Sequence, residues 1–98
     1  MKYAVQYLEI AREDLKAARG YLSRFYPGTT RGFLDDLRKR IHLLKSTPLM
    51  YEQYHDDPFY RKMVVGDYLV FYHVVDGRRL VEIHRILHGS RDIRKYIN

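Results

Sequence analysis

The sequence predicts an α+β fold in which an antiparallel helical hairpin packs on one face of a curved, mainly antiparallel four-stranded sheet. Three observations lead to this class. The chain of 98 residues is long enough for one hydrophobic core and too short for two, so residues 1–98 form a single domain. Apolar residues recur at helical spacing in the first half. In the second half, alternating runs are separated by turn residues.

The first half contains one strand and two helices. Residues 2–7, KYAVQY, alternate and predict an N-terminal strand. Spacings of three and four then predict a helix over residues 8–25. Its apolar stripe consists of Leu8, Ala11, Leu15, Ala18, Leu22 and Phe25. Pro27 and Gly28 end this helix, so the link to the next helix is short and the pair is antiparallel.

The second helix is expected to start with Thr29 or Thr30 as its cap and to end before Pro48. Residues 49–58 lack a regular hydrophobic period, so we expect a loop there. Three strands follow over residues 59–65, 68–75 and 80–88. Gly66 with Asp67 makes the first turn, and Asp76 with Gly77 predicts a two-residue turn at positive φ. The middle strand is bulky on both faces, which indicates a central position, and residues 90–98 predict a short terminal helix.

Composition and charge limit the functions that the chain can have. It is 46% hydrophobic and 31% charged, as in folded soluble proteins, and it has no cysteine, which excludes disulfides and thiolate chemistry. The N-terminal residues lack a secretory pattern and no run is long enough to span a membrane, so we expect a cytoplasmic protein. Of the net charge of +6, residues 78–98 carry +4 (six basic, two acidic), which leaves +2 for the rest. Such a region attracts phosphates or an acidic protein, or is simply a solvated surface.

The last predicted strand carries the most notable polar pattern. Strict alternation places Glu82, His84 and His88 on one face and Arg85 on the other. Side chains about 7 Å apart along a strand do not converge on a metal, so neither a metal nor a cofactor is expected. Two interpretations stand: the histidines are packed at the sheet edge, or they serve general acid–base cleavage of RNA beside arginines that stabilise the phosphorane.

Other basic and aromatic residues extend this region. Arg61 and Lys62, at the start of the first strand of the meander, add to the basic surface. Arg91 either pairs with Asp92 or holds a phosphate. Tyr96 either stacks on a nucleobase or is an ordinary packed tyrosine.

Nearly the whole chain resembles a known family. The segments on which the resemblance rests are a helix with the pattern A.EDL...YL, a second helix that ends LLKSTP, and above all GDYLVFYHVVDG and RILHGSRD. They resemble the toxins of bacterial type II toxin–antitoxin systems, the RelE/ParE superfamily. The resemblance implies a small basic toxin that a cognate antitoxin neutralises in a hetero-oligomeric complex, with no membrane partner.

The resemblance also implies two possible targets. RelE-like members are ribosome-dependent, metal-independent mRNA endoribonucleases, whereas ParE-like members, the plasmid-stabilisation branch, poison DNA gyrase. In RelE-like members an arginine follows the tyrosine that begins the central strand, but here Leu69 follows Tyr68. Arg91 matches the arginine after the last strand, and Tyr96 is an approximate counterpart of the tyrosine that follows it. VGDYLVFY and the tail favour the ParE-like branch.

The two possible targets imply different functional residues. If the chain is a ribonuclease, the predicted catalytic residues are Arg61, Arg85, His88 and Arg91. The predicted target-binding residues are Arg78, Arg79, Arg91, Arg94, Lys95 and Tyr96. A third reading is a non-toxic binding partner with a degenerate site.

Overall fold

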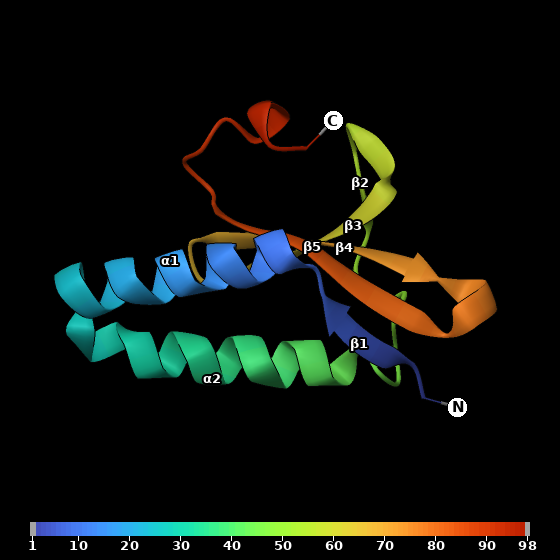
Figure 1. Ribbon diagram of the computed structural model, residues 1–98, viewed down its shortest axis with the longest axis horizontal. Helices are drawn as coiled ribbons and strands as arrows, with labels where there is room; N and C mark the ends of the chain where they lie inside the picture. Colours follow the sequence, from blue (N-terminus) through green and yellow to red (C-terminus); the bar gives the residue numbers. More distant parts are fainter. Residues whose placement is uncertain (1, 98) are drawn as a thin grey trace.

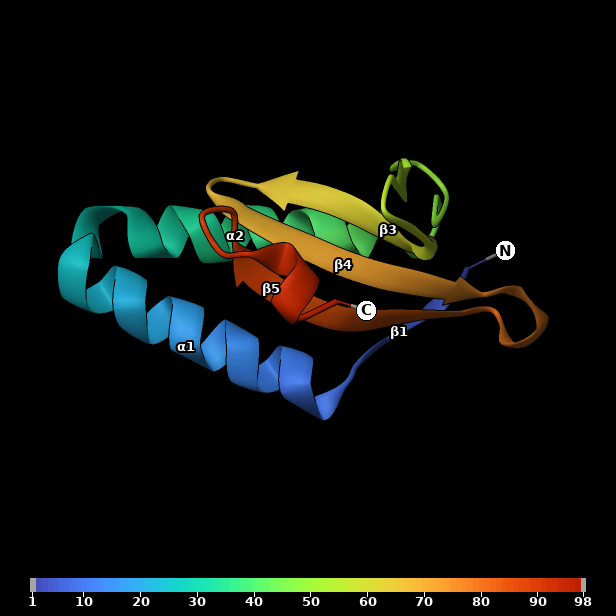
Figure 2. The same cartoon turned by 90° about the horizontal axis from the view of Figure 1, so that it is seen from above.

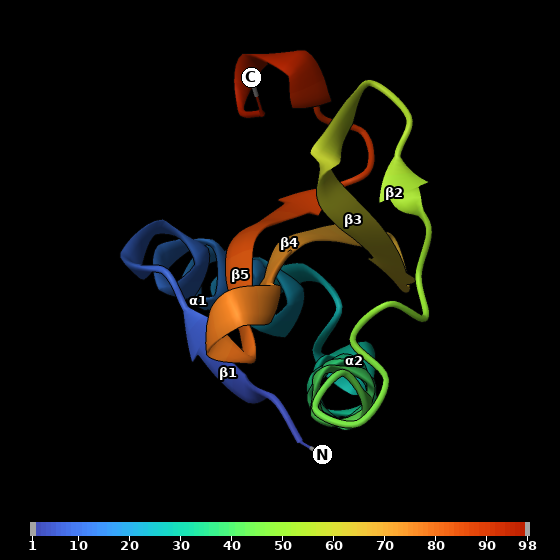
Figure 3. The same cartoon turned by 90° about the vertical axis from the view of Figure 1, so that its right-hand side faces the viewer.

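The computed structural model describes residues 2–97 and consists of a sheet with two helices on one face and the C-terminal segment on the other (Figures 1 and 3). In chain order its strands and α-helices are β1 (Ala4–Tyr7), α1 (Glu9–Phe25), α2 (Pro27–Leu43), β2 (Gln53–Tyr54), β3 (Asp57–Val65), β4 (Tyr68–Val75) and β5 (Leu80–His88). Two short 3-10 helices, η1 (Asp76–Arg78) and η2 (Ile93–Lys95), follow β4 and β5. The predicted α+β class is confirmed.

Within residues 2–97 the sheet has the order β1-β5-β4-β3-β2, in which the β1–β5 pair is parallel and the other pairs are antiparallel. The fifth strand, β2, lies in the segment that we predicted to be a loop. It has two residues, too few to show a period, and it forms because Gln53 and Tyr54 pair with β3. The predicted meander and the central position of β4 are confirmed.

The helical hairpin is tighter than predicted. Pro27 is the first residue of α2, not a spacer before it, and Tyr26 is the N-cap without a side-chain cap. Proline is tolerated there because the first N–H groups of a helix have no intrahelical partner. The predicted threonine caps lie inside the first turn, where the hydroxyls of Thr29 and Thr30 donate to the Tyr26 carbonyl. The helix ends at Leu43, before the predicted limit at Pro48.

The turn between β4 and β5 also differs from the prediction. Val75 pairs with Leu80, so the loop has four residues in place of two. The loop contains η1, and its residue with positive φ is Arg79, at 47°, and not Gly77 as predicted. The Tyr3 hydroxyl donates to the Asp76 carboxylate at 2.8 Å and ties this loop to the N-terminus. At the other turn Gly66 has φ +57°, a conformation that glycine tolerates best.

The two faces of the sheet have separate cores. The helix-side core consists of Ala11, Ala18, Leu37, Ile41, Leu44, Met63, Val65, Tyr68, Val70, Tyr72, Val81, Ile83 and Ile86. On the other face the tail-side core consists of Phe71, Leu87 and Ile97, with Ile93 and Tyr96 packed against it. The predicted open face is therefore partly covered by the chain's own C-terminal segment (Figure 3).

Candidate functional site: the edge of β5 and the segment after it

A bulge in β5 decides where its polar side chains point. Phe71 pairs with Arg85 but Tyr72 pairs with Ile83, so β5 has one extra residue at this point. His84 and Arg85 therefore both lie on the tail-side face, and the alternation after them is reversed. The prediction that Glu82, His84 and His88 line one face is wrong: beyond the bulge Ile86 belongs to the helix-side core, and His88 packs edge-on against Tyr68 of that core at 5.2 Å.

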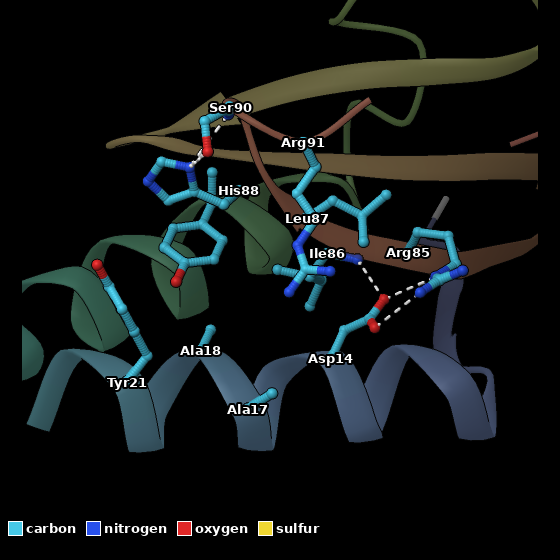
Figure 4. Close-up of a pocket in the computed structure, with 11 residues that line it drawn as sticks. Asp14, Ala17, Ala18, Tyr21, Arg85, Ile86, Leu87, His88, Ser90 and Arg91 are labelled. Atoms are coloured by element: carbon cyan, nitrogen blue, oxygen red, sulfur yellow. Dashed lines mark hydrogen bonds and ion pairs between the residues drawn. The ribbon is translucent and has the colours of Figure 1, made fainter. Parts of the chain in front are cut away.

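Arg85 is held by a carboxylate from α1. Its Nε and Nη2 donate to Asp14 at 2.8 and 3.0 Å, and the backbone N–H of Ile86 donates to the same carboxylate at 3.0 Å (Figure 4). Both side chains are largely buried, at 15% exposed for Arg85 and 13% for Asp14. The hydrogen bond to Asp14 raises the pKa of Arg85. The Arg85 guanidinium therefore already has a carboxylate partner, and this ion pair joins β5 to α1.

Arg61 lies on β3, away from Arg85 and the edge of β5. It pairs with Tyr72 in the β3–β4 ladder, which turns it toward the helix side of the sheet. Its Nη1 donates to the Tyr51 carbonyl at 2.7 Å, so it fastens the loop before β2. Of the four residues predicted for a ribonuclease, Arg61 is therefore apart, whereas Arg85, His88 and Arg91 line one cavity.

A cavity of about 290 Å³ lies between α1, the free edge of β5 and the segment that follows it (Figure 4). Its lining residues are Asp14, Ala17, Ala18, Tyr21, Tyr68, Arg85, Ile86, Leu87, His88, Ser90 and Arg91. Arg91 extends from the segment after β5 toward α1 (Figure 4). Its Nη1 donates to the Tyr96 hydroxyl at 2.8 Å. Within residues 2–97 it has no carboxylate within 4.0 Å, so of the two alternatives for Arg91 the pair with Asp92 is not formed.

His88 has a defined hydrogen-bonding state in this cavity. The backbone N–H of Ser90 donates to its Nδ1 at 3.1 Å, and the Ser90 hydroxyl lies 2.7 Å from the same nitrogen. Because Nδ1 accepts a hydrogen bond, the ring proton of the neutral imidazole is on Nε2. A histidine arranged in this way supports the turn after β5.

The remaining predicted binding residues form two groups. Arg78 and Arg79 lie in the β4–β5 loop, whereas Arg94 and Lys95 lie in η2 above the other face of the sheet (Figure 1). Tyr96 is half-buried, and its ring lies 5.2 Å from the Arg85 guanidinium and 5.4 Å from that of Arg91. It packs against the tail-side core, as its alternative reading predicted.

The sequence prediction missed a cluster on the tail-side face. Phe59 stacks on His73 with ring centroids 3.7 Å apart, and His84 lies 6.3 Å from His73. His84 Nε2 is 3.2 Å from the Glu82 carboxylate, and His73 Nδ1 is 2.8 Å from the Phe59 carbonyl. His73 is opposite Glu82 in the β4–β5 ladder, which brings it close to His84, and this register depends on how the two strands pair, so it could not be read from either strand alone. Across residues 2–97 no group of three or more potential ligands is placed to hold a metal ion.

Solved structures of type II toxin–antitoxin systems share this layered α+β fold. The chain matches a structure described as the chromosomal ParDE system from P. aeruginosa with a TM-score of 0.74 and 15% identity, over 91% of this chain and 98% of that one. It also matches a mutant of the E. coli toxin RelE in the free state, with a TM-score of 0.66 and 15% identity over the whole of both chains.

A third match is the RelBE2 toxin–antitoxin complex from Mycobacterium tuberculosis, with a TM-score of 0.59 and 20% identity over 90% of this chain and 99% of that one. Comparison with curated proteins found no match. The family model described as the ParE toxin of the type II toxin–antitoxin system parDE matches residues 5–93. The chain therefore belongs to the ParE toxin family, which confirms the resemblance read from the sequence. Within residues 2–97 no helix is long and apolar enough to cross a membrane.

Proposed function

We propose that this toxin acts on DNA gyrase and is neutralised by a cognate antitoxin. The observation that carries the proposal is that the predicted ribonuclease residues are already engaged by the fold: Arg61 lies apart, and of the three that line the cavity Arg85 is held by Asp14. Arg85 is paired with Asp14, Arg61 holds the Tyr51 carbonyl on the helix side, and His88 lies beside Tyr68. General acid–base cleavage needs its groups within hydrogen-bonding reach of one phosphate. A toxin that acts through protein contact has no such requirement.

The family match and the charge distribution also support the proposal. The matching family model is that of ParE toxins. Arg94 and Lys95 are exposed on η2 and together with Arg91 present three cations on one short segment. Three cations so close together suit contact with an acidic macromolecular surface.

One observation favours a second candidate, a metal-independent endoribonuclease. His73 and His84 lie 6.3 Å apart on the tail-side face beside Glu82, and Phe59 next to them is 49% exposed. Two imidazoles and a stacking ring are a plausible acid–base pair with a base-binding surface. In this case His73 and His84, and not the predicted quartet, would carry the chemistry.

The experiment is induction of the chain in bacteria without antitoxin, with gyrase–DNA adducts and transcript integrity measured in the same cultures. We expect growth arrest with adducts and intact transcripts. Arg94→Glu with Lys95→Glu should relieve the arrest, and His73→Ala with His84→Ala should not. These point variants are better than a truncated tail, because truncation would also remove Ile97 from the tail-side core. Phased transcript cleavage that the histidine pair abolishes would establish the second candidate, and unaffected growth would mean that the chain is not toxic.

A further inference from the structure

We propose that the hairpin tip, residues 19–31 where α1 meets α2, is a second contact surface for gyrase and inserts its aromatic rings into an apolar pocket with an acidic rim. This inference rests on the proposed function, because it names a further surface through which the toxin meets that target. It adds to the contact proposed for the cations of the segment after β5.

The hairpin tip projects from the body of the molecule. The two helices lie along the longest dimension, which is 41 Å, and their junction extends beyond the end of the sheet (Figures 1 and 2). The C-terminal segment lies above the other face of the sheet (Figure 3). A projecting element can enter a recess in a partner without any change in the rest of the fold.

Three aromatic side chains form a cluster on the hairpin tip. Tyr21, Phe25 and Tyr26 are 45%, 57% and 54% exposed. The rings of Phe25 and Tyr26 lie 4.9 and 6.0 Å from that of Tyr21, and none of the three belongs to the helix-side core. Phe25 ends the apolar stripe predicted for the first helix, yet the fold does not bury it. Exposed rings gathered in this way are typical of a surface that a partner covers.

The charge around these rings is entirely positive. Residues 15–34 carry a net charge of +4 with no acidic residue, so the remainder of residues 1–77 carries −2. The four cations are Lys16, Arg19, Arg24 and Arg31. All four are exposed, and within residues 2–97 none has a carboxylate within 4.0 Å. The Arg24 guanidinium lies 5.5 Å from the centre of the Phe25 ring, so the charge and the aromatic surface coincide, and an acidic rim complements both.

The arrangement of the rings favours a protein partner over a nucleic acid. The Tyr21 ring is tilted by 46° from that of Phe25 and by 48° from that of Tyr26, so the rings form a rounded knob and not a row of parallel planes. Bases of a single strand stack on aromatic faces, and Arg24 already lies over Phe25. Tyrosine and arginine are also the residue types that contribute most to binding at the centre of protein interfaces.

The test measures binding of the purified chain to the intact gyrase holoenzyme, with and without DNA, by surface plasmon resonance. Phe25→Ser should weaken binding by about 30-fold and Arg24→Glu by about 10-fold, because one removes an anchor and the other reverses a rim charge. Leu43 ends α2 as Phe25 ends α1 and is 48% exposed, and Lys39 is an exposed cation of α2. Leu43→Ser and Lys39→Glu are therefore matched controls, and they should change binding less than about threefold.

A substitution at Gly28 separates binding from stability. A Cβ added there meets nothing within 4 Å, and the first turn of α2 has no acidic residue. Gly28→Glu should therefore raise the Tm, through helix propensity and the favourable position of a carboxylate at a helix N-terminus. The same carboxylate, two residues from Tyr26, should weaken gyrase binding by about 10-fold. Gly28→Gln adds similar bulk without charge and should weaken binding less. Loss of binding by a chain that has become more stable cannot result from unfolding.

The yield of gyrase–DNA adducts with the purified proteins should decrease in the same order as the affinity. The inference is overturned if Phe25→Ser and Gly28→Glu bind gyrase as well as the two controls do. It is also overturned if these variants lose affinity only for DNA, or only for the product of the reading frame that adjoins this chain's own. A parent chain that does not bind gyrase would refute the proposed function and this inference together, whereas a parent that binds no better than its hairpin-tip variants would refute this inference alone.

Discussion

The ion pair between Asp14 and Arg85 gives the sharpest stability prediction. Asp14→Ala would leave the guanidinium largely buried without its carboxylate and the N–H of Ile86 without an acceptor. Removing one partner of a fully buried pair costs about 3–5 kcal/mol. Both side chains keep some exposure at the mouth of an open cavity, so water recovers part of the loss, and we expect about 3 kcal/mol. For a domain of this size that corresponds to a decrease in Tm of about 15 °C.

The assay is a double-mutant cycle in urea. Asp14→Ala, Arg85→Met and the combined variant are unfolded under the same conditions. Because the methionine removes the orphaned charge, the combined variant should cost less than the sum of the two single changes, by about 2 kcal/mol. Asp14→Asn keeps an acceptor for the Ile86 N–H and should lie between Asp14→Ala and the parent. The reasoning is refuted if Asp14→Ala costs under about 1 kcal/mol or if the two single changes are additive.

Two further predictions concern the two cores. Burial raises the pKa of Tyr72 to about 12, so between pH 10 and 12 the unfolded chain binds fewer protons than the folded one and the free energy of unfolding decreases. In urea titrations at pH 8–11.5, Tyr72→Phe should flatten this decrease, and at pH 8 it should cost about 1 kcal/mol because the hydrogen bond to the Pro48 carbonyl is lost. An unchanged slope would contradict the assignment of the decrease to Tyr72. Ile97 is 6% exposed in the tail-side core, so Ile97→Ala should lower the free energy of unfolding by about 2 kcal/mol. It should also speed proteolysis after Arg91 and Arg94. Unchanged cleavage would mean that this contact does not hold the tail.

The sequence predicted the elements better than it predicted their contacts. The strands over residues 68–75 and 80–88 have the predicted boundaries, because alternation and turn residues are local signals. The bulge opposite Phe71 has no local signal, since it depends on how two strands pair, and it moves His88 to the other face. One misplaced residue in the register was enough to invalidate the predicted row of histidines.

The same limit applies to the candidate site. The basic end of the chain and Arg91 were found from composition and resemblance. Asp14, which occupies Arg85, is 71 residues away in sequence, and nothing in the spacing of α1 marks it as different from its exposed neighbours. The cover that Tyr96 and Ile97 provide for the sheet likewise follows from a tertiary contact, whereas the local pattern showed only a short terminal helix.

The parallel pairing of β1 with β5 affects when this toxin can form during synthesis. Among residues 2–97, β1 forms a ladder with β5 alone, so its partner does not exist until residues 80–83 have been made. β5 is also the partner of β4, so it joins the first strand to the rest of the sheet. A nascent chain interrupted before residue 80 therefore lacks β5, and its first strand has no partner in the sheet. Completion of the sheet therefore depends on a contact between residues 4–7 and residues 80–83, and contacts between segments so far apart in sequence form slowly.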